Sequence, residues 1–220
     1  MMINGRNAYP DVVADKLCRI RDPHVAPINA LADEIADHNG LARGMVPYVD
    51  PDLGGVDARA LVLLDNPSTK AETGTGSGLL SLDNDDRTAR NCREMYLKHG
   101  IDWREIVHWN VCPFPTENAK NGGSYAAERA RGAPSTRRLV ALLPHLEIVL
   151  PLGANARDGW RRADVRRSGL YDFAGRKVPH CSNRGLNQNG GRAEFERAVV
   201  DLSRMRACPC ESERREASQE

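Results

Sequence analysis

The sequence predicts an α/β protein, a three-layer α/β/α sandwich around a central, mostly parallel four-stranded sheet. Short apolar runs alternate with amphipathic stretches along the chain, as in sheets built from βαβ units. Two of the runs are dense in valine, isoleucine and leucine, which is typical of strands covered by helices on both faces. The chain has 220 residues, 40% of them hydrophobic, enough to bury the core of one domain.

The individual elements follow from the spacing of apolar residues. Residues 1–45 are expected to form an N-terminal helical segment, since Ile28, Leu31 and Ile35 recur at helical spacing. The expected strands are Ala60–Leu64, Ile106–Trp109, Leu146–Leu152 and Lys177–Pro179. The expected helices between and after them are Asp86–His99, Ala126–Leu143 and Arg192–Arg206. We therefore expect one domain over residues 1–206 and a polar, disordered tail at 207–220.

Composition excludes several classes of protein. The mean hydropathy is −0.54, and no apolar run is long enough to cross a membrane. The N-terminus lacks the basic and apolar regions of a secretion signal. The six cysteines are dispersed, unlike those of a small disulfide scaffold. We expect a cytoplasmic protein with reduced thiols and no membrane association.

The positive charge is concentrated in one part of the chain. The net charge is only +1, yet residues 129–192 contain thirteen basic and four acidic residues, a local excess of +9. Such a region fits binding to a polyanion. Solvated helix faces explain it equally well.

Polar residues follow three of the expected strands. Asp65–Ser68 follows the first strand, Asn110–Pro113 the second and His180–Asn187 the fourth. Ligands of open α/β sheets bind just outside the carboxyl ends of the strands. The sequence therefore predicts that these segments form one site at the rim of the sheet.

Common catalytic and cofactor motifs are missing. Gly74–Gly78 is rich in glycine but lacks the Lys-Ser/Thr pair of a P-loop, which favours a flexible loop close to a ligand. No G-x-S-x-G nucleophile motif is present. Cys208 and Cys210 have no matching pair at zinc spacing. We expect neither a metal nor another cofactor.

Together, the three strand-end segments resemble the motifs of the uracil-DNA glycosylase superfamily. Leu64–Ser68 is similar to the first motif, in which Pro follows a water-positioning Asp or Asn. His180–Asn187 is similar to the second, a His-Pro-Ser followed by Leu, and Trp109–Pro113 to the intervening strand whose Asn reads the base. The resemblance extends over residues 60–190.

The chain departs from the family pattern at several positions. Leu64 replaces the usual Gly of the first motif, and Cys181 replaces the Pro of the second. No Tyr follows Pro67, and no Phe is present to stack on the base, so Leu79 or Leu80 is expected in its place. The cysteine spacing does not match the iron-sulfur pattern of some branches.

The resemblance implies hydrolysis of the N-glycosidic bond of uracil, or of a related deaminated base, in a nucleotide flipped out of DNA. His180 would donate to a carbonyl oxygen of the leaving base, and Asn66 would hold the attacking water. Asp65 is the alternative to Asn66, because only one of two adjacent strand residues faces the pocket. Asn110 would distinguish uracil from cytosine.

The resemblance also implies contacts with single- or double-stranded DNA by a monomeric enzyme. Candidate phosphate-binding residues are Ser68, Ser182, Arg184 and Asn187. Leu186 would insert into the base stack as an exposed wedge, although a core position is the more common place for such a leucine.

Less specific interpretations stay open. His180, Asn66 and Asn110 also fit ordinary capping or turn positions at strand ends. Two other functions fit the same fold, namely an enzyme that binds a nucleotide or phosphate through Gly74–Gly78 and a non-catalytic nucleic-acid-binding protein.

Overall fold

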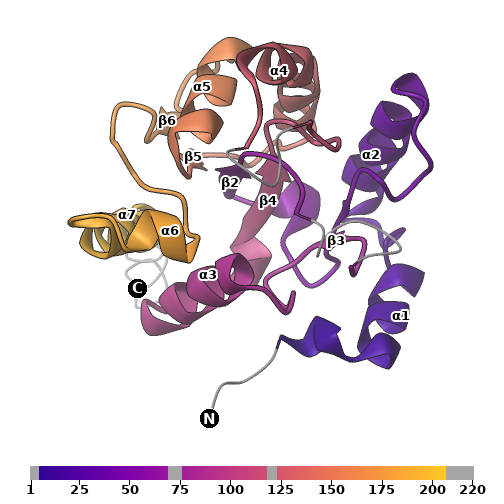
Figure 1. Ribbon diagram of the computed structural model, residues 1–220, viewed down its shortest axis with the longest axis horizontal. Helices are drawn as coiled ribbons and strands as arrows, with labels where there is room; N and C mark the ends of the chain where they lie inside the picture. Colours follow the sequence, from indigo (N-terminus) through magenta and orange to yellow (C-terminus); the bar gives the residue numbers. More distant parts are fainter. Residues whose placement is uncertain (1–4, 69–75, 118–122, 207–220) are drawn as a thin grey trace, which may run out of the picture.

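The computed structural model describes residues 5–68, 76–117 and 123–206. A parallel four-stranded sheet lies at its centre, with the strand order β4-β2-β5-β6 (Figure 1). Its strands are β2 (Ala60–Leu64), β4 (Ile106–Asn110), β5 (Ile148–Pro151) and β6 (Tyr171–Asp172). The predicted tail at 207–220 lies outside the described residues.

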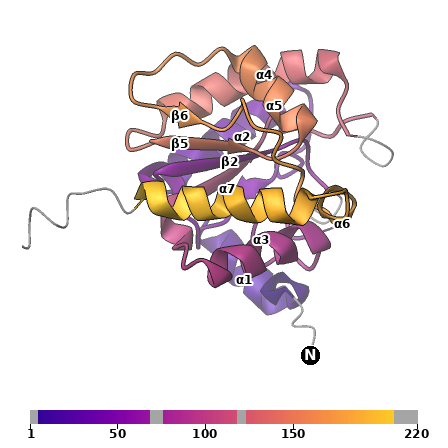
Figure 2. The same ribbon diagram turned by 90° about the vertical axis from the view of Figure 1, so that its left-hand side faces the viewer.

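Helices cover both faces of this sheet, which confirms the predicted three-layer α/β/α architecture (Figures 1 and 2). On one side lie α4 (Ala126–Ala141) and α5 (Ala154–Ala163). On the other lie α3 (Arg87–Lys98) and α7 (Gly191–Arg206), with the short α6 (Asn183–Leu186) beside α7. No helix among the described residues is both long enough and apolar enough to cross a membrane.

The N-terminal part packs beside β4. It contains η1 (Arg6–Ala8), α1 (Pro10–Cys18) and α2 (Ala26–His38). A small parallel sheet joins β1 (Tyr48–Val49) to β3 (Leu79–Leu80), and the short helices η2 (Gly55–Asp57) and η3 (Trp103–Glu105) precede β2 and β4. One hydrophobic cluster extends from Val25 in this part to Leu202 in α7.

Local sequence explains why α3 forms where it does. The carboxylate of Asp86 accepts a hydrogen bond from the backbone N–H of Ala89 at 2.9 Å, which caps the helix. Cys92, Met95 and Tyr96 then recur at helical spacing and are buried against the sheet. The Asp86 cap places the first turn of α3 beside the ends of β2 and β4.

The fourth strand was predicted in the wrong place. Residues 177–179 form no strand, and the fourth strand is β6, a two-residue edge strand whose residues are both exposed. It pairs with β5 through hydrogen bonds from Tyr171 N to Glu147 O and from Phe173 N to Val149 O. Pro179 lacks the N–H that a ladder needs, and an exposed edge strand has no apolar run by which to be recognised.

The order of the strands in the sheet leaves a crevice at the carboxyl end of β2. The chain passes from β2 to β4 on one side and then returns to β5 on the other. Such a reversal leaves a crevice outside the carboxyl ends of the strands, where ligands of open α/β sheets bind.

Candidate functional site

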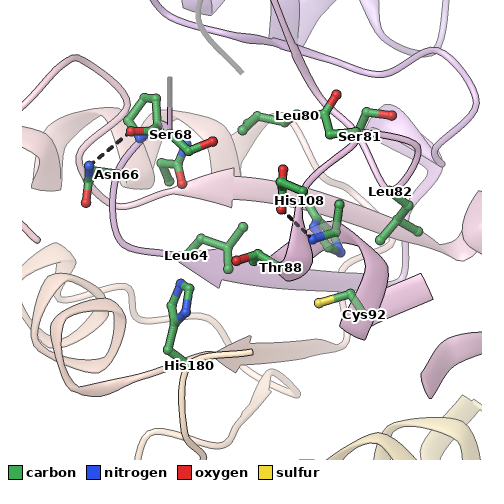
Figure 3. A pocket seen from close by; sticks show the side chains of 15 residues that line it. Leu64, Asn66, Ser68, Leu80, Ser81, Leu82, Thr88, Cys92, His108 and His180 are labelled. Atoms are coloured by element: carbon green, nitrogen blue, oxygen red, sulfur yellow. Dashed lines mark hydrogen bonds between the residues drawn. The ribbon is translucent and has the colours of Figure 1, made fainter. Parts of the chain in front are cut away.

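A cavity of about 100 Å³ lies at this crevice (Figure 3). Since roughly 10–15 Å³ is enough for one water molecule, the cavity has room for a larger ligand. Its walls come from the end of β2, the segment that leaves β3, the first turns of α3, the end of β4 and His180. The cavity therefore lies where the polar strand-end segments were predicted to meet.

The sheet register separates Asp65 from Asn66. Leu64 of β2 pairs with Asn110 of β4, and both residues line the cavity, as does Asn66 two positions further on. Asp65 faces the other layer, where its carboxylate accepts hydrogen bonds from the backbone N–H of Ser124 at 3.0 Å and from the Asn155 amide at 2.8 Å. Asp65 thus joins β2 to the helix layer of α4 and α5, and Asn66 is the residue that lines the cavity.

His180 is held at the rim by its own loop. The backbone N–H of Ser182 donates to His180 Nδ1 at 3.0 Å, so a neutral ring carries its proton on Nε2. Burial lowers the pKa of His180, although the charges of Asp65 and Asp86 oppose this effect. In Figure 3 the ring points toward Leu64 at the end of β2. His180 therefore presents a neutral N–H donor near the cavity.

Two glycines, Gly153 and Gly185, make room for the backbone and the side chain of His180. A Cβ on Gly185 would lie 2.1 Å from the carbonyl oxygen of His180. Gly153, with φ of +94°, would place a Cβ 3.1 Å from the Cβ of His180. Side chains at these positions would push the imidazole out of place.

Asn110 carries an unpaired polar group. It is 1% exposed, and its amide nitrogen has no hydrogen-bond partner among the described residues. A buried amide without a partner costs free energy, and native structures contain few such groups. Asn110 lines the cavity, so this unpaired donor lies in the cavity wall.

Leu79 and Leu80 differ in position, as expected for adjacent residues of a strand. Leu80 lines the cavity, whereas Leu79 is fully buried and lies outside its lining. Of the glycine-rich segment, Gly74 and Thr75 lie outside the described residues, and Gly76–Gly78 leads into β3.

The expected DNA-contact residues lie around α6 and the end of β2. Ser68, Arg184 and Asn187 are exposed, and Ser68 also lines the cavity. Ser182 is half-buried and caps α6 by accepting a hydrogen bond from Gly185 N–H. The expectation of an exposed wedge at Leu186 is wrong for this conformation. Leu186 is 3% exposed, because the turn of α6 directs it into the hydrophobic core.

Sequence reasoning missed some of the cavity lining, most notably His108. His108 lies two residues before Asn110 on the same face of β4, so strand alternation alone was enough to find it. Asp86, Thr88 and Cys92 come from α3, and no sequence signal showed that this helix would pack against β4.

One group of carboxylates has the spacing of a cation site. Among the described residues, Asp50, Asp52 and Asp83 lie close enough together to share a metal ion. The ammonium of Lys16, itself 1% exposed, lies between them at 2.7, 3.1 and 2.9 Å. Burial opposes its charge, but the hydrogen bonds and charges of Asp50 and Asp83 raise the pKa of Lys16. The lysine itself supplies the positive charge that these carboxylates need.

Comparison with known proteins adds no assignment, since no protein-family model and no curated protein matches this sequence. The chemistry of the cavity is therefore the basis for a functional conclusion.

Proposed function

We propose that this protein is a monomeric, cofactor-independent DNA glycosylase that hydrolyses the N-glycosidic bond of uracil or a related deaminated base. The observation that carries the proposal is the unpaired, buried amide of Asn110 in a cavity that Asn66 and His180 also line. A base reader, a water-binding amide and a neutral imidazole donor are the groups that such a hydrolysis requires. The target nucleotide would have to leave the DNA stack to reach them.

Asn66 is suited to position the attacking water. Its amide nitrogen donates to the carbonyl of Pro67 at 3.0 Å, which orients the side chain. Its Oδ1 then has no partner among the described residues and is available to accept a hydrogen bond from water. An amide is a weak base, but attack on an oxocarbenium-like sugar depends mainly on a well-placed water.

His180 is suited to stabilise the leaving base. As the glycosidic bond breaks, negative charge develops on the base and its carbonyl oxygens. A neutral imidazole with its proton on Nε2 donates a hydrogen bond to such an oxygen. The hydrogen bond from Ser182 N–H to Nδ1 favours this tautomer.

Asn110 is suited to recognise the base. Its amide donates to one carbonyl of uracil and accepts from the adjacent ring N–H. Cytosine presents the reverse pattern, so its binding would leave buried polar groups unpaired. The exposed Arg184 of α6 and Asn187 beside it would contact the DNA backbone.

The test is cleavage of single-stranded and duplex oligonucleotides that carry one uracil, with alkali used to break the resulting abasic sites. We expect His180→Ala and Asn66→Ala each to lower the cleavage rate by about 10²–10³-fold, as loss of a transition-state donor does. His145→Ala, which removes an exposed histidine outside the cavity lining, serves as the matched control.

Three results would contradict the proposal in different ways. Activity that both substitutions leave unchanged would refute the assigned roles. No cleavage of uracil, hypoxanthine, xanthine or mismatched thymine, combined with retained DNA binding, would favour a non-catalytic binder. Thermal stabilisation by nucleotides but not by uracil-containing DNA would favour a nucleotide- or phosphate-binding enzyme.

A further inference from the structure

The cavity contains a second buried polar side chain that the proposed chemistry does not use. His108 is 4% exposed, lines the cavity and lies two residues before Asn110 on the same face of β4. Two residues of a strand span about 6–7 Å, so His108 lies that much further from the rim than Asn110. In Figure 3 it lies beside Thr88 and Cys92 of α3, whereas His180 is at the other end of the cavity.

Tyr96 determines which nitrogen of His108 carries the proton. The Tyr96 hydroxyl lies 3.2 Å from His108 Nε2, and the two rings meet edge to face. Burial raises the pKa of Tyr96 well above its ordinary value, so the hydroxyl keeps its proton. Imidazole nitrogen is a better acceptor than the neighbouring Cys92 thiol, so the hydroxyl donates to Nε2. A neutral His108 then carries its own proton on Nδ1.

This Nδ1 donor has no hydrogen-bonding partner in the part of the chain that the structure describes. Among the described residues, the Tyr96 hydroxyl is the only hydrogen-bonding partner of the His108 ring. Burial lowers the pKa of His108 to about 4, so the ring is neutral at pH 7. The β4 side of the cavity therefore has two donors without a partner among the described residues, the buried amide nitrogen of Asn110 and the Nδ1–H of His108.

We infer that His108 is a specificity-determining residue that donates from Nδ1 to the carbonyl oxygen at position 4 of an oxo-pyrimidine. This inference rests on the proposed function and names its substrate class. A carbonyl oxygen has two lone pairs, so it accepts from Asn110 and His108 together. The exocyclic amino group of cytosine would meet two donors and leave both unpaired. His180 would donate to the other carbonyl oxygen of uracil. The three side chains would then bind both carbonyl oxygens and the ring N–H between them.

The test compares free uracil with its 2-thio and 4-thio analogues, because sulfur is a weak acceptor. Dissociation constants are measured by calorimetry for the wild type and for the double variant Tyr96→Phe/His108→Leu. Removing both partners leaves no unpaired hydroxyl, so the fold should tolerate the change. The control is His145→Leu, which removes an exposed histidine.

We expect the wild type to prefer uracil over 4-thiouracil and the double variant to reduce this preference by about tenfold, the effect of one hydrogen bond. The preference over 2-thiouracil should stay the same in both proteins. Tyr96→Phe alone keeps the imidazole but lets it adopt either tautomer. This single variant should reduce the preference over 4-thiouracil by a smaller factor. His145→Leu should change neither preference.

Two results would overturn the inference alone. They are an unchanged 4-thio preference in the double variant, or an equal loss of both preferences, which would indicate a general loosening of the cavity. Uracil binding with the expected preferences but without DNA cleavage would refute the glycosylase and leave His108 as a base reader. A wild type that neither binds uracil nor cleaves uracil-containing DNA would refute both.

Discussion

Acidification should destabilise this protein through His108, whose imidazole is neutral in the folded state. Burial lowers its pKa to about 4, whereas histidine in an unfolded chain has a pKa of about 6.5. Between these values the unfolded state binds a proton that the folded state does not. The stability that His108 contributes is therefore fully present above pH 6.5 and is lost as the pH falls toward 4.

The size of this effect follows from the difference between the two pKa values. One unit of pKa corresponds to about 1.4 kcal/mol, so the free energy of unfolding should fall by about 3 kcal/mol between pH 7 and pH 4 through this residue. Domains are commonly stable by about 5–15 kcal/mol, so the loss is a substantial part of the total.

The measurement is urea unfolding, followed by circular dichroism, at several pH values between 7 and 4. The double variant Tyr96→Phe/His108→Leu lacks the titrating group and should lose about 3 kcal/mol less than the wild type over this range. Other groups with lowered pKa values, such as His180 and Asp52, are present in both proteins and cancel in the comparison. Equal pH dependence in the two proteins would show that His108 is not held neutral, and the reasoning would fail.

Three further outcomes are expected. Lys16→Met should lower the free energy of unfolding by about 3–5 kcal/mol, because it leaves three carboxylates without their buried ammonium. The control Lys98→Met, at the exposed pair with Glu196, should change the free energy of unfolding little. Similar urea midpoints for the two variants would contradict this prediction. Gly185→Ala should abolish cleavage of uracil-containing DNA by displacing the His180 carbonyl, while Gly175→Ala, with open space around its Cβ, should retain full activity in the same assay. Because burial lowers the pKa of His180, the cleavage rate should stay constant as the pH falls through about 6.5 and should decline only at more acid pH. A decline centred at or above about pH 6.5 would instead indicate an exposed imidazole.

The sequence by itself determined the layers of the fold and the meeting of the strand-end segments. Dense apolar runs identified β2, β4 and β5, because strands buried on both faces have little choice of residue. The parallel order of these strands then brought Asn66 and Asn110 to one edge. The polar, glycine-containing α5 and the exposed β6 had no comparable pattern, so the first was missed and the second misplaced.

Tertiary packing alone decided what each polar side chain faces. The alternation of side chains along a strand predicted that Asp65 and Asn66 point in opposite directions. Only the contacts of Ser124 and Asn155 with Asp65 showed which of the two residues lines the cavity. The burial of Leu186 depended on the way α6 turns toward the core. The environment of His108 came from Tyr96 on a helix that packs over β4. Hydrogen bonds and burial depend on neighbours distant in sequence, and the periodicity of one segment contains no information about them.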